Sequence, residues 1–172
     1  MADRMSGATL RPMLPTDGPM LASIFQASIE TLTEEDYSDD QREAWAALAD
    51  TPDFAKRLTG GLTLVASLAG EPVGFAVLEG KDKIGMLYVA PDLARQGIAT
   101  MLCDALQRIA AGRGTAKLIV DASDTARDFF MVRGFVPMVR NMVSVGGEWL
   151  GNTTMEFDLV AAGLNKPTDG AS

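Results

Sequence analysis

The sequence predicts a mixed α/β (α+β) fold in which a mostly antiparallel sheet of six to seven strands is flanked by about four helices. Three observations predict this class. The chain has 172 residues, 47% hydrophobic and 22% charged, which is typical of one domain with its own core. Strand-like and helix-like runs alternate, and Gly, Pro and Asp residues separate them. We expect one domain over residues 1–160 and a flexible tail over 161–172.

The first third of the chain predicts one strand and two helices. Residues 8–14 have the character of a strand, and residues 18–32 carry apolar side chains at helical spacing. After an acidic loop, Ser38 is suited to cap a second helix over 39–49. A short helical turn over 51–58 completes this part.

Three strands are expected next, at 62–68, 72–78 and 84–89, and the turns between them predict an antiparallel meander. After Pro91 the apolar period becomes helical from residue 98, and glycines end that helix near residue 112.

The last part predicts a buried strand over 117–120 and a helix capped by Ser123 or Asp124. Two strands, 135–145 and 148–159, flank a Gly-Gly turn and form a hairpin. The order β-α-α-β-β-β-α-β-α-β-β implies a mixed sheet with helices on its faces.

The composition excludes several kinds of chemistry. The chain has no histidine, which removes the commonest general base and every metal site that needs an imidazole. Its one cysteine, Cys103, cannot form an intramolecular disulfide, and this fits a reducing compartment. Residues 1–18 lack the apolar core of a signal peptide, and no run approaches the ~18 apolar residues of a membrane span. We therefore expect a cytoplasmic protein with no metal and no membrane partner.

The charge is concentrated in residues 30–53, which hold nine acids and one base. This segment carries −8, which equals the formal net charge of the chain. Such a surface would repel nucleic acid and attract cations, including protonated amines.

A strand end followed by a helix start carries the most informative pattern. Leu87-Tyr88-Val89-Ala90-Pro91 precedes Arg95-Gln96-Gly97-Ile98-Ala99-Thr100. Small residues let a ligand approach the backbone, and the free N–H groups of a first helical turn suit a pyrophosphate. Tight packing of the helix on the sheet is the alternative interpretation.

Because of these residues, the sequence from about 10 to 159 resembles the GNAT superfamily of acyl-CoA-dependent N-acyltransferases. The element order, Val89-x-Pro91, the helix start at Gly97 and the run from Phe129-Phe130 to Gly134-Phe135 agree together. The resemblance implies a sheet that splays beside the strand ending at Val89. It also implies that acetyl-CoA binds there and that an amine enters from the opposite side to attack the thioester directly.

The resemblance assigns the cofactor contacts residue by residue. The expected cofactor-binding residues are Leu87, Val89, Arg95, Gln96, Gly97, Ile98, Ala99, Thr100, Ser123 and Phe130. Phe130 stands where the family often has a tyrosine that protonates the departing thiolate, and Ser123 stands at the usual asparagine. Water, Ser123 or Tyr88 is expected to supply the proton instead.

An acceptor amine with a pKa near 10 must lose a proton before it attacks, so a base is also expected. Asp121 is the first candidate and Glu79 the second, acting through water. A capping carboxylate at Asp121 and a solvated turn at Glu79 are the alternatives.

Substrate recognition is expected from the loop after the first helix, where acids meet a cation and aromatic rings supply cation–π contact. The residues are Glu34, Glu35, Asp36, Tyr37 and Trp45, of which Trp45 is alternatively a core residue. The predicted function is acetyl transfer from acetyl-CoA to a primary amine of a cationic small molecule, and a homodimer is the candidate assembly. The alternatives are a catalytically silent acyl-CoA-binding module, a peptide amine as acceptor, or a domain that binds another phosphate ligand.

Overall fold

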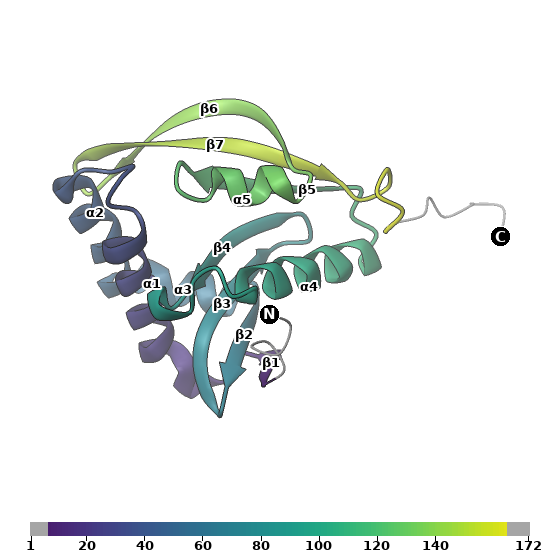
Figure 1. Cartoon of the computed structure of the whole chain (residues 1–172), viewed down its shortest axis with the longest axis horizontal. Helices are drawn as coiled ribbons and strands as arrows, with labels where there is room; N and C mark the ends of the chain where they lie inside the picture. Colours follow the sequence, from purple (N-terminus) through teal and green to yellow (C-terminus); the bar gives the residue numbers. More distant parts are fainter. Residues whose placement is uncertain (1–6, 165–172) are drawn as a thin grey trace, which may run out of the picture.

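Figure 1 shows the computed structural model of the protein, which describes residues 7–164. In this part of the chain, seven strands form one sheet in the order β1-β2-β3-β4-β5-β7-β6. The strands are β1 (Ala8–Pro12), β2 (Leu62–Leu68), β3 (Glu71–Glu79), β4 (Lys83–Val89), β5 (Lys117–Ser123), β6 (Val136–Val145) and β7 (Glu148–Asp158). Neighbours are antiparallel except β4 and β5, which are parallel. The predicted mixed, mostly antiparallel sheet is confirmed.

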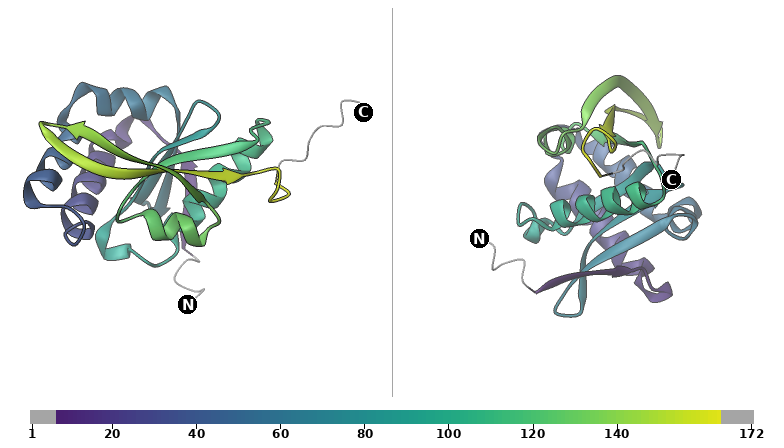
Figure 2. Two further views of the ribbon diagram at one scale, coloured as in Figure 1. Left: turned by 90° about the horizontal axis from the view of Figure 1, so that it is seen from above. Right: turned by 90° about the vertical axis from the view of Figure 1, so that its right-hand side faces the viewer.

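Two layers of helices cover the sheet. The helices are α1 (Gly18–Leu32), α2 (Asp39–Ala46), α3 (Pro52–Gly60), α4 (Ile98–Gly112) and α5 (Arg127–Val132). Phe25 of α1 and Phe54 of α3 pack with Phe75 of β3 in one cluster of buried residues, whereas Leu102 of α4 packs with Leu118 of β5 in the other. Figure 2 shows α1 and α2 (purple and blue) apart from α4 and α5 (green).

Local chemistry explains most element boundaries. Ser38 and Gln41 form the capping box that starts α2, as a serine three residues before a glutamine favours. The second helix is shorter than the predicted 39–49, because a 3₁₀ turn (Ala47–Asp50) follows Ala46. Residues 52–60 form a full helix, α3, so the fold has one helix more than the sequence predicts.

Ser123 ends β5 and does not cap α5 at its first turn. Its hydroxyl accepts a hydrogen bond from the Ala126 amide at 3.1 Å, which closes a turn before the helix begins at Arg127. The strand β5 is also three residues longer than predicted, because β7 pairs with it as far as Ser123↔Asn152.

The sheet opens between β4 and β5. These strands pair only at Lys83↔Ile119 and Ile84↔Val120, although β4 stays paired with β3 as far as Val89. From Gly85 onward the edge of β4 that faces β5 is therefore open.

Within the described residues, no helix or strand follows β7. Turns follow β7 as far as residue 164, and the rest of the predicted tail, 165–172, lies outside the described residues. No helix within residues 7–164 is long and apolar enough to cross a membrane.

Candidate active site

The start of α4 presents free backbone N–H groups. Arg95 and Gly97 have positive φ angles of 63° and 89°, and these two left-handed residues turn the chain just before α4 begins. Glycine adopts such a φ without a steric penalty, which explains Gly97 at the N-cap. The first helical bond from this cap is Met101 N–H to Gly97 O at 3.0 Å, so the amides of 98–100 have no partner within the helix. The positive end of the helix dipole adds to them.

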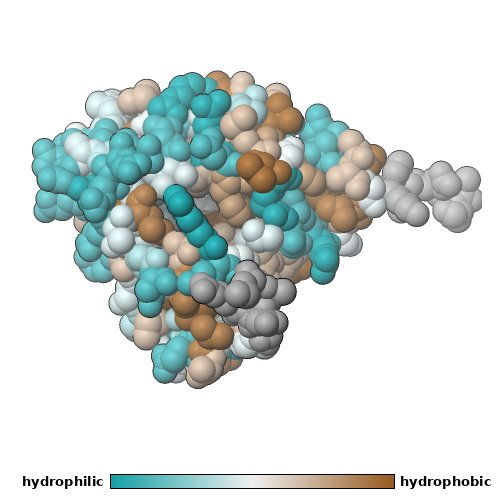
Figure 3. Space-filling view, viewed as in Figure 1, coloured by the Kyte–Doolittle hydropathy of each residue, from teal (hydrophilic) through white to brown (hydrophobic). Residues whose placement is uncertain are grey.

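A cavity of about 530 Å³ lies beside this helix start, and we call it the helix cavity. Its walls come from the end of α1, the segment 93–100, the end of β4 and the segment 123–130. Figure 3 shows a hollow near the centre of this face, bordered by both polar and apolar side chains.

A second cavity of about 270 Å³ lies in the opening between β4 and β5, and we call it the strand cavity. The hairpin β6–β7 closes it with Val143, Val145 and Leu150, and α2 adds Trp45. Its charged lining residues are Arg57, Lys83 and Asp121.

The two cavities meet where the sheet opens. Six residues line both of them: Trp45, Leu87, Tyr88, Ser123, Ala126 and Phe130. A ligand in the helix cavity and a ligand in the strand cavity would therefore both contact these residues.

Tyr88 lies at this junction among other aromatic rings. Its ring centre is 4.7 Å from that of Phe25 and 6.5 Å from that of Trp45. Burial raises the pKa of Tyr88 to about 12, against the opposing effects of a Trp45 hydrogen bond and the Arg57 charge. Its hydroxyl is therefore protonated at neutral pH and can donate a hydrogen bond.

Phe130 and Ser123 stand beside Tyr88 at the junction. Phe130 is buried and its ring has no proton to give, whereas the Ser123 hydroxyl already accepts from Ala126 and keeps its own O–H free to donate.

The two candidate bases have different surroundings. Asp121 lines the strand cavity, 3.1 Å from Lys83 Nζ, and accepts a hydrogen bond from Thr154 at 2.7 Å. Partial burial opposes ionisation of Asp121, but Thr154 and Lys83 outweigh it and hold its pKa below the usual value. Glu79 accepts a hydrogen bond from Arg57 at 2.9 Å and does not line either cavity.

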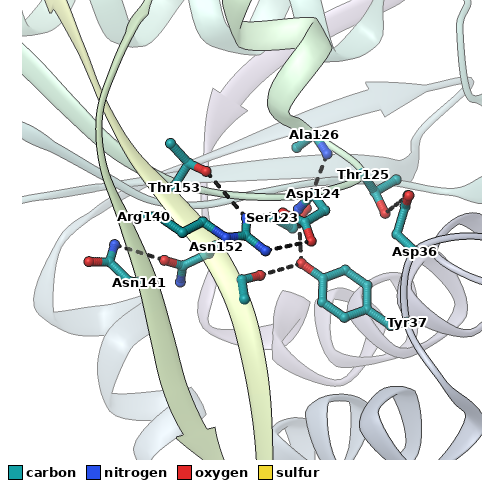
Figure 4. A network of polar contacts seen from close by, with 11 residues as sticks. Asp36, Tyr37, Ser123, Asp124, Thr125, Ala126, Arg140, Asn141, Asn152 and Thr153 are labelled. Atoms are coloured by element: carbon teal, nitrogen blue, oxygen red, sulfur yellow. Dashed lines mark hydrogen bonds and ion pairs between the residues drawn. The ribbon is translucent and has the colours of Figure 1, made fainter.

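The predicted recognition loop is tied down by a polar network (Figure 4). The Tyr37 hydroxyl donates to Gly151 O at 2.6 Å and accepts from the Asp124 amide at 2.8 Å, and burial raises the pKa of Tyr37. Asp124 in turn pairs with Arg140. Tyr37 thus joins this loop to β7 and to the end of β5.

The other predicted recognition residues divide between cavity and surface. Trp45 lines both cavities and stacks edge-on against Tyr37 at 5.3 Å. Asp36 accepts a hydrogen bond from Thr125, while Glu34 and Glu35 are exposed, and none of the three acids lines either cavity.

The predicted cofactor residues lie together at the helix cavity with two exceptions. Leu87, Val89, Arg95, Gly97, Ala99, Thr100, Ser123 and Phe130 line it. The side chain of Ile98 is buried in the core, and that of Gln96 reaches back to Asp92 O. These two residues offer only their backbone to the site.

Sequence patterns missed Arg57 and Lys83. Arg57 belongs to a helix that was expected to be only a turn, and Lys83 lies one residue before the predicted strand. Neither has a motif around it, and only the fold brings the two together.

The geometry agrees with what comparison with known proteins finds. Residues 33–159 match the family model described as acetyltransferase (GNAT) domain. The chain is 31% identical over 153 residues to the uncharacterized N-acetyltransferase YafP of Escherichia coli (strain K12), covering 89% of this chain and 97% of that protein.

Solved structures show the same fold. A GCN5-related N-acetyltransferase from Rhodopseudomonas palustris, also titled aminotransferase, class-II, is 55% identical with a TM-score of 0.86, covering 87% of this chain and 94% of that one. The PaiA N-acetyltransferase of Thermoplasma acidophilum, in complex with coenzyme A, is 16% identical with a TM-score of 0.70, covering 88% and 98%. With a family model that spans most of the sheet and all but three of the residues lining the two cavities, the chain belongs to the GNAT acetyltransferases and is an acyltransferase enzyme.

Proposed function

We propose that the enzyme transfers an acetyl group from acetyl-CoA in the helix cavity to a primary amine in the strand cavity, by direct attack in a ternary complex. The observation that carries this proposal is the set of six residues that line both cavities. Two ligands that enter from opposite sides would meet there without a covalent enzyme intermediate. The coenzyme A complex of the Thermoplasma relative supports the choice of donor.

The residues present fit a CoA thioester. The free amides at the start of α4 suit the pyrophosphate, and the twisted backbone at Arg95 and Gly97 leaves them accessible. The open edge of β4 at Leu87 and Val89 offers backbone groups to the amides of the pantetheine arm. The thioester supplies an activated acetyl group, and the sulfur leaves as the new C–N bond forms.

Side chains that line the cavities would accept one proton and donate another. The acceptor ammonium loses its first proton to solvent before it attacks. The nitrogen loses a second proton as the amide forms, and we assign this proton to Asp121 through water, since Asp121 lines the strand cavity and Glu79 does not. The departing sulfur gains one from Tyr88, with Ser123 as the second candidate. The amine thus becomes an amide, and the donor leaves as a thiol.

A cationic small molecule remains the predicted acceptor because the acidic segment would attract it. A primary amine is itself mostly protonated at neutral pH, and the acidic segment 30–53 would raise its concentration near the protein. Glu34, Glu35 and Asp36 would then act while the amine approaches and would not contact it. A peptide amine is the alternative acceptor.

The test is a calorimetric titration with acetyl-CoA, CoA and ADP, followed by thiol release with an amine panel. Gly97→Glu places a bulky negative side chain at the helix start and should abolish binding. Gly114→Glu is the matched control, because Gly114 has a similar φ of 86° but follows the other end of α4. Micromolar binding that requires the pantetheine arm is expected, and preference for ADP would refute the CoA site. Binding without thiol release from any amine would favour a silent module.

A further inference from the structure

The charges inside the strand cavity differ in sign from those of the acidic segment. Two cations, Arg57 and Lys83, and one carboxylate, Asp121, line this cavity. Lys83 lies where β4 and β5 are still paired, Asp121 follows the last paired residue of β5, and Arg57 contacts Gly85, whereas Tyr88 marks the open end. The end of the cavity near Lys83 and Arg57 therefore offers two cations to an anionic group.

Arg57 is held in place by contacts that leave donors available. Its Nε donates to Glu79 at 2.9 Å, and its Nη2 donates to the Gly85 carbonyl at 2.9 Å. These bonds use two of the five N–H donors of a guanidinium, whose fork matches a carboxylate. Arg57 and Tyr88 both line the strand cavity.

A β-bulge makes this arrangement possible. Ile84 pairs with Leu78 and Met86 pairs with Val77, so Gly85 has no residue opposite it on β3. The Gly85 carbonyl is thereby free for Arg57, and the Glu79 carboxylate lies over the bare Cα of Gly85. Glu79 positions Arg57 and stays out of the cavity wall.

Lys83 provides the second cation. Its Nζ is 3.1 Å from one oxygen of Asp121, while Thr154 donates to the other. An ammonium has three donors, so Lys83 can bind a further oxygen. Each of the two cations is paired with one carboxylate, Arg57 with Glu79 and Lys83 with Asp121, and of these two carboxylates only Asp121 lines the cavity.

We propose that the acceptor is a primary amine that also carries a carboxylate, which Arg57 and Lys83 bind while the amine faces Tyr88. This inference rests on the proposed function, since it takes the strand cavity as the acceptor site. Trp45 and Leu48 on one side and Leu150 on the other give the carbon chain an apolar wall. Four residues of β4 lie between Lys83 and Tyr88, which makes about 16 Å of strand, so the length of the carbon chain matters.

The test measures binding without turnover, by calorimetry on protein saturated with CoA. The probes are sets of equal chain length with six, eight or ten carbons: the ω-amino acid, the alkylamine and the diamine. At the best length we expect the amino acid to bind at least about tenfold more tightly than the diamine, the difference made by one charge-assisted pair. Arg57→Gln and Lys83→Gln should each remove this preference.

Lys117→Gln is the matched control, because Lys117 also lies on a strand of the sheet and pairs with an acid, Glu156, but lines neither cavity. It should keep the preference, and thermal melting should show that all three variants are folded. Should Arg57→Gln fail to fold, Lys83→Gln alone still decides.

Equal binding of the three probes, tighter binding of the diamine, or no binding of any amino acid would overturn the carboxylate site. None of these results affects acetyl transfer, which thiol release measures separately. Conversely, tight amino acid binding without thiol release would refute the transfer activity and keep the site.

Discussion

At the scale of single residues, Tyr88 is the proton donor that we propose for the departing sulfur. It lines both cavities, and its pKa of about 12 keeps it protonated throughout the neutral range. We expect Tyr88→Phe to lower kcat about 10- to 100-fold, because the thiolate then leaves without a proton. Acetyl-CoA affinity should change less than about twofold, since the ring is kept. Stopped-flow thiol release and calorimetry measure the two quantities.

Ser123→Ala provides the comparison for this prediction. If Tyr88 is the donor, Ser123→Ala should reduce kcat less than Tyr88→Phe does. The opposite order would transfer the role to Ser123, whose hydroxyl lies at the same junction.

The residues that the sequence could and could not predict differ in a physical way. Gly97 and Phe130 each belong to a local sequence pattern, and the spacing within the pattern predicts where each residue lies relative to its own helix. Arg57 and Lys83 meet only through tertiary structure, because the Gly85 carbonyl must be freed by a bulge before Arg57 can reach it. A one-residue irregularity of this kind has no signature in hydrophobic periodicity.

At the scale of elements, the bulge in β4 predicts an unusual sensitivity at Gly85. A methyl group there would overlap the Glu79 carboxylate, which must then move away from Arg57. We expect Gly85→Ala to lower the free energy of unfolding by about 1 kcal/mol, because the ion pair is partly exposed. Urea unfolding measures this loss.

Gly112→Ala is the contrasting variant, since a methyl group at Gly112 meets nothing within 4 Å at the end of α4. This change should leave stability equal or raise it by about 0.4–1 kcal/mol. Equal stability of both variants with the wild type would show that Glu79 relocates without cost.

Element boundaries follow the same division between local and tertiary causes. The sequence predicts the start of α2 at Ser38 because a capping box is a local motif. The extent of β5 depends on its partner: pairing with β7 carries the strand three residues past the predicted end. The opening beside β5 likewise depends on strand pairing, because β4 stops pairing with β5 after Ile84 but stays paired with β3 as far as Val89.

At the scale of the whole molecule, one edge of the sheet remains open. The edge strand β6 exposes Val136, Met138, Val139, Met142 and Val143. An exposed apolar edge strand favours association with another chain. The homodimer stays a prediction. The strand β6 also contributes Val143 and Val145 to the strand cavity.

The distribution of ionisable groups over the whole chain predicts a simple pH profile. There is no histidine, and the shifted pKa values near the site lie away from neutrality: Asp121 is lowered and Tyr88 is raised to about 12. Burial also raises the pKa of Cys103 to about 11. None of these three groups changes charge between pH 6 and 9, so the free amine fraction of the acceptor should control kcat/KM. We expect kcat/KM to rise about tenfold per pH unit from 7 to 9 and to level off near the acceptor's own pKa of about 10. Steady-state thiol release with two amines of different pKa measures this, and the plateau should move with the amine. A plateau near pH 7 that is the same for both amines would instead identify a base in the protein that titrates there.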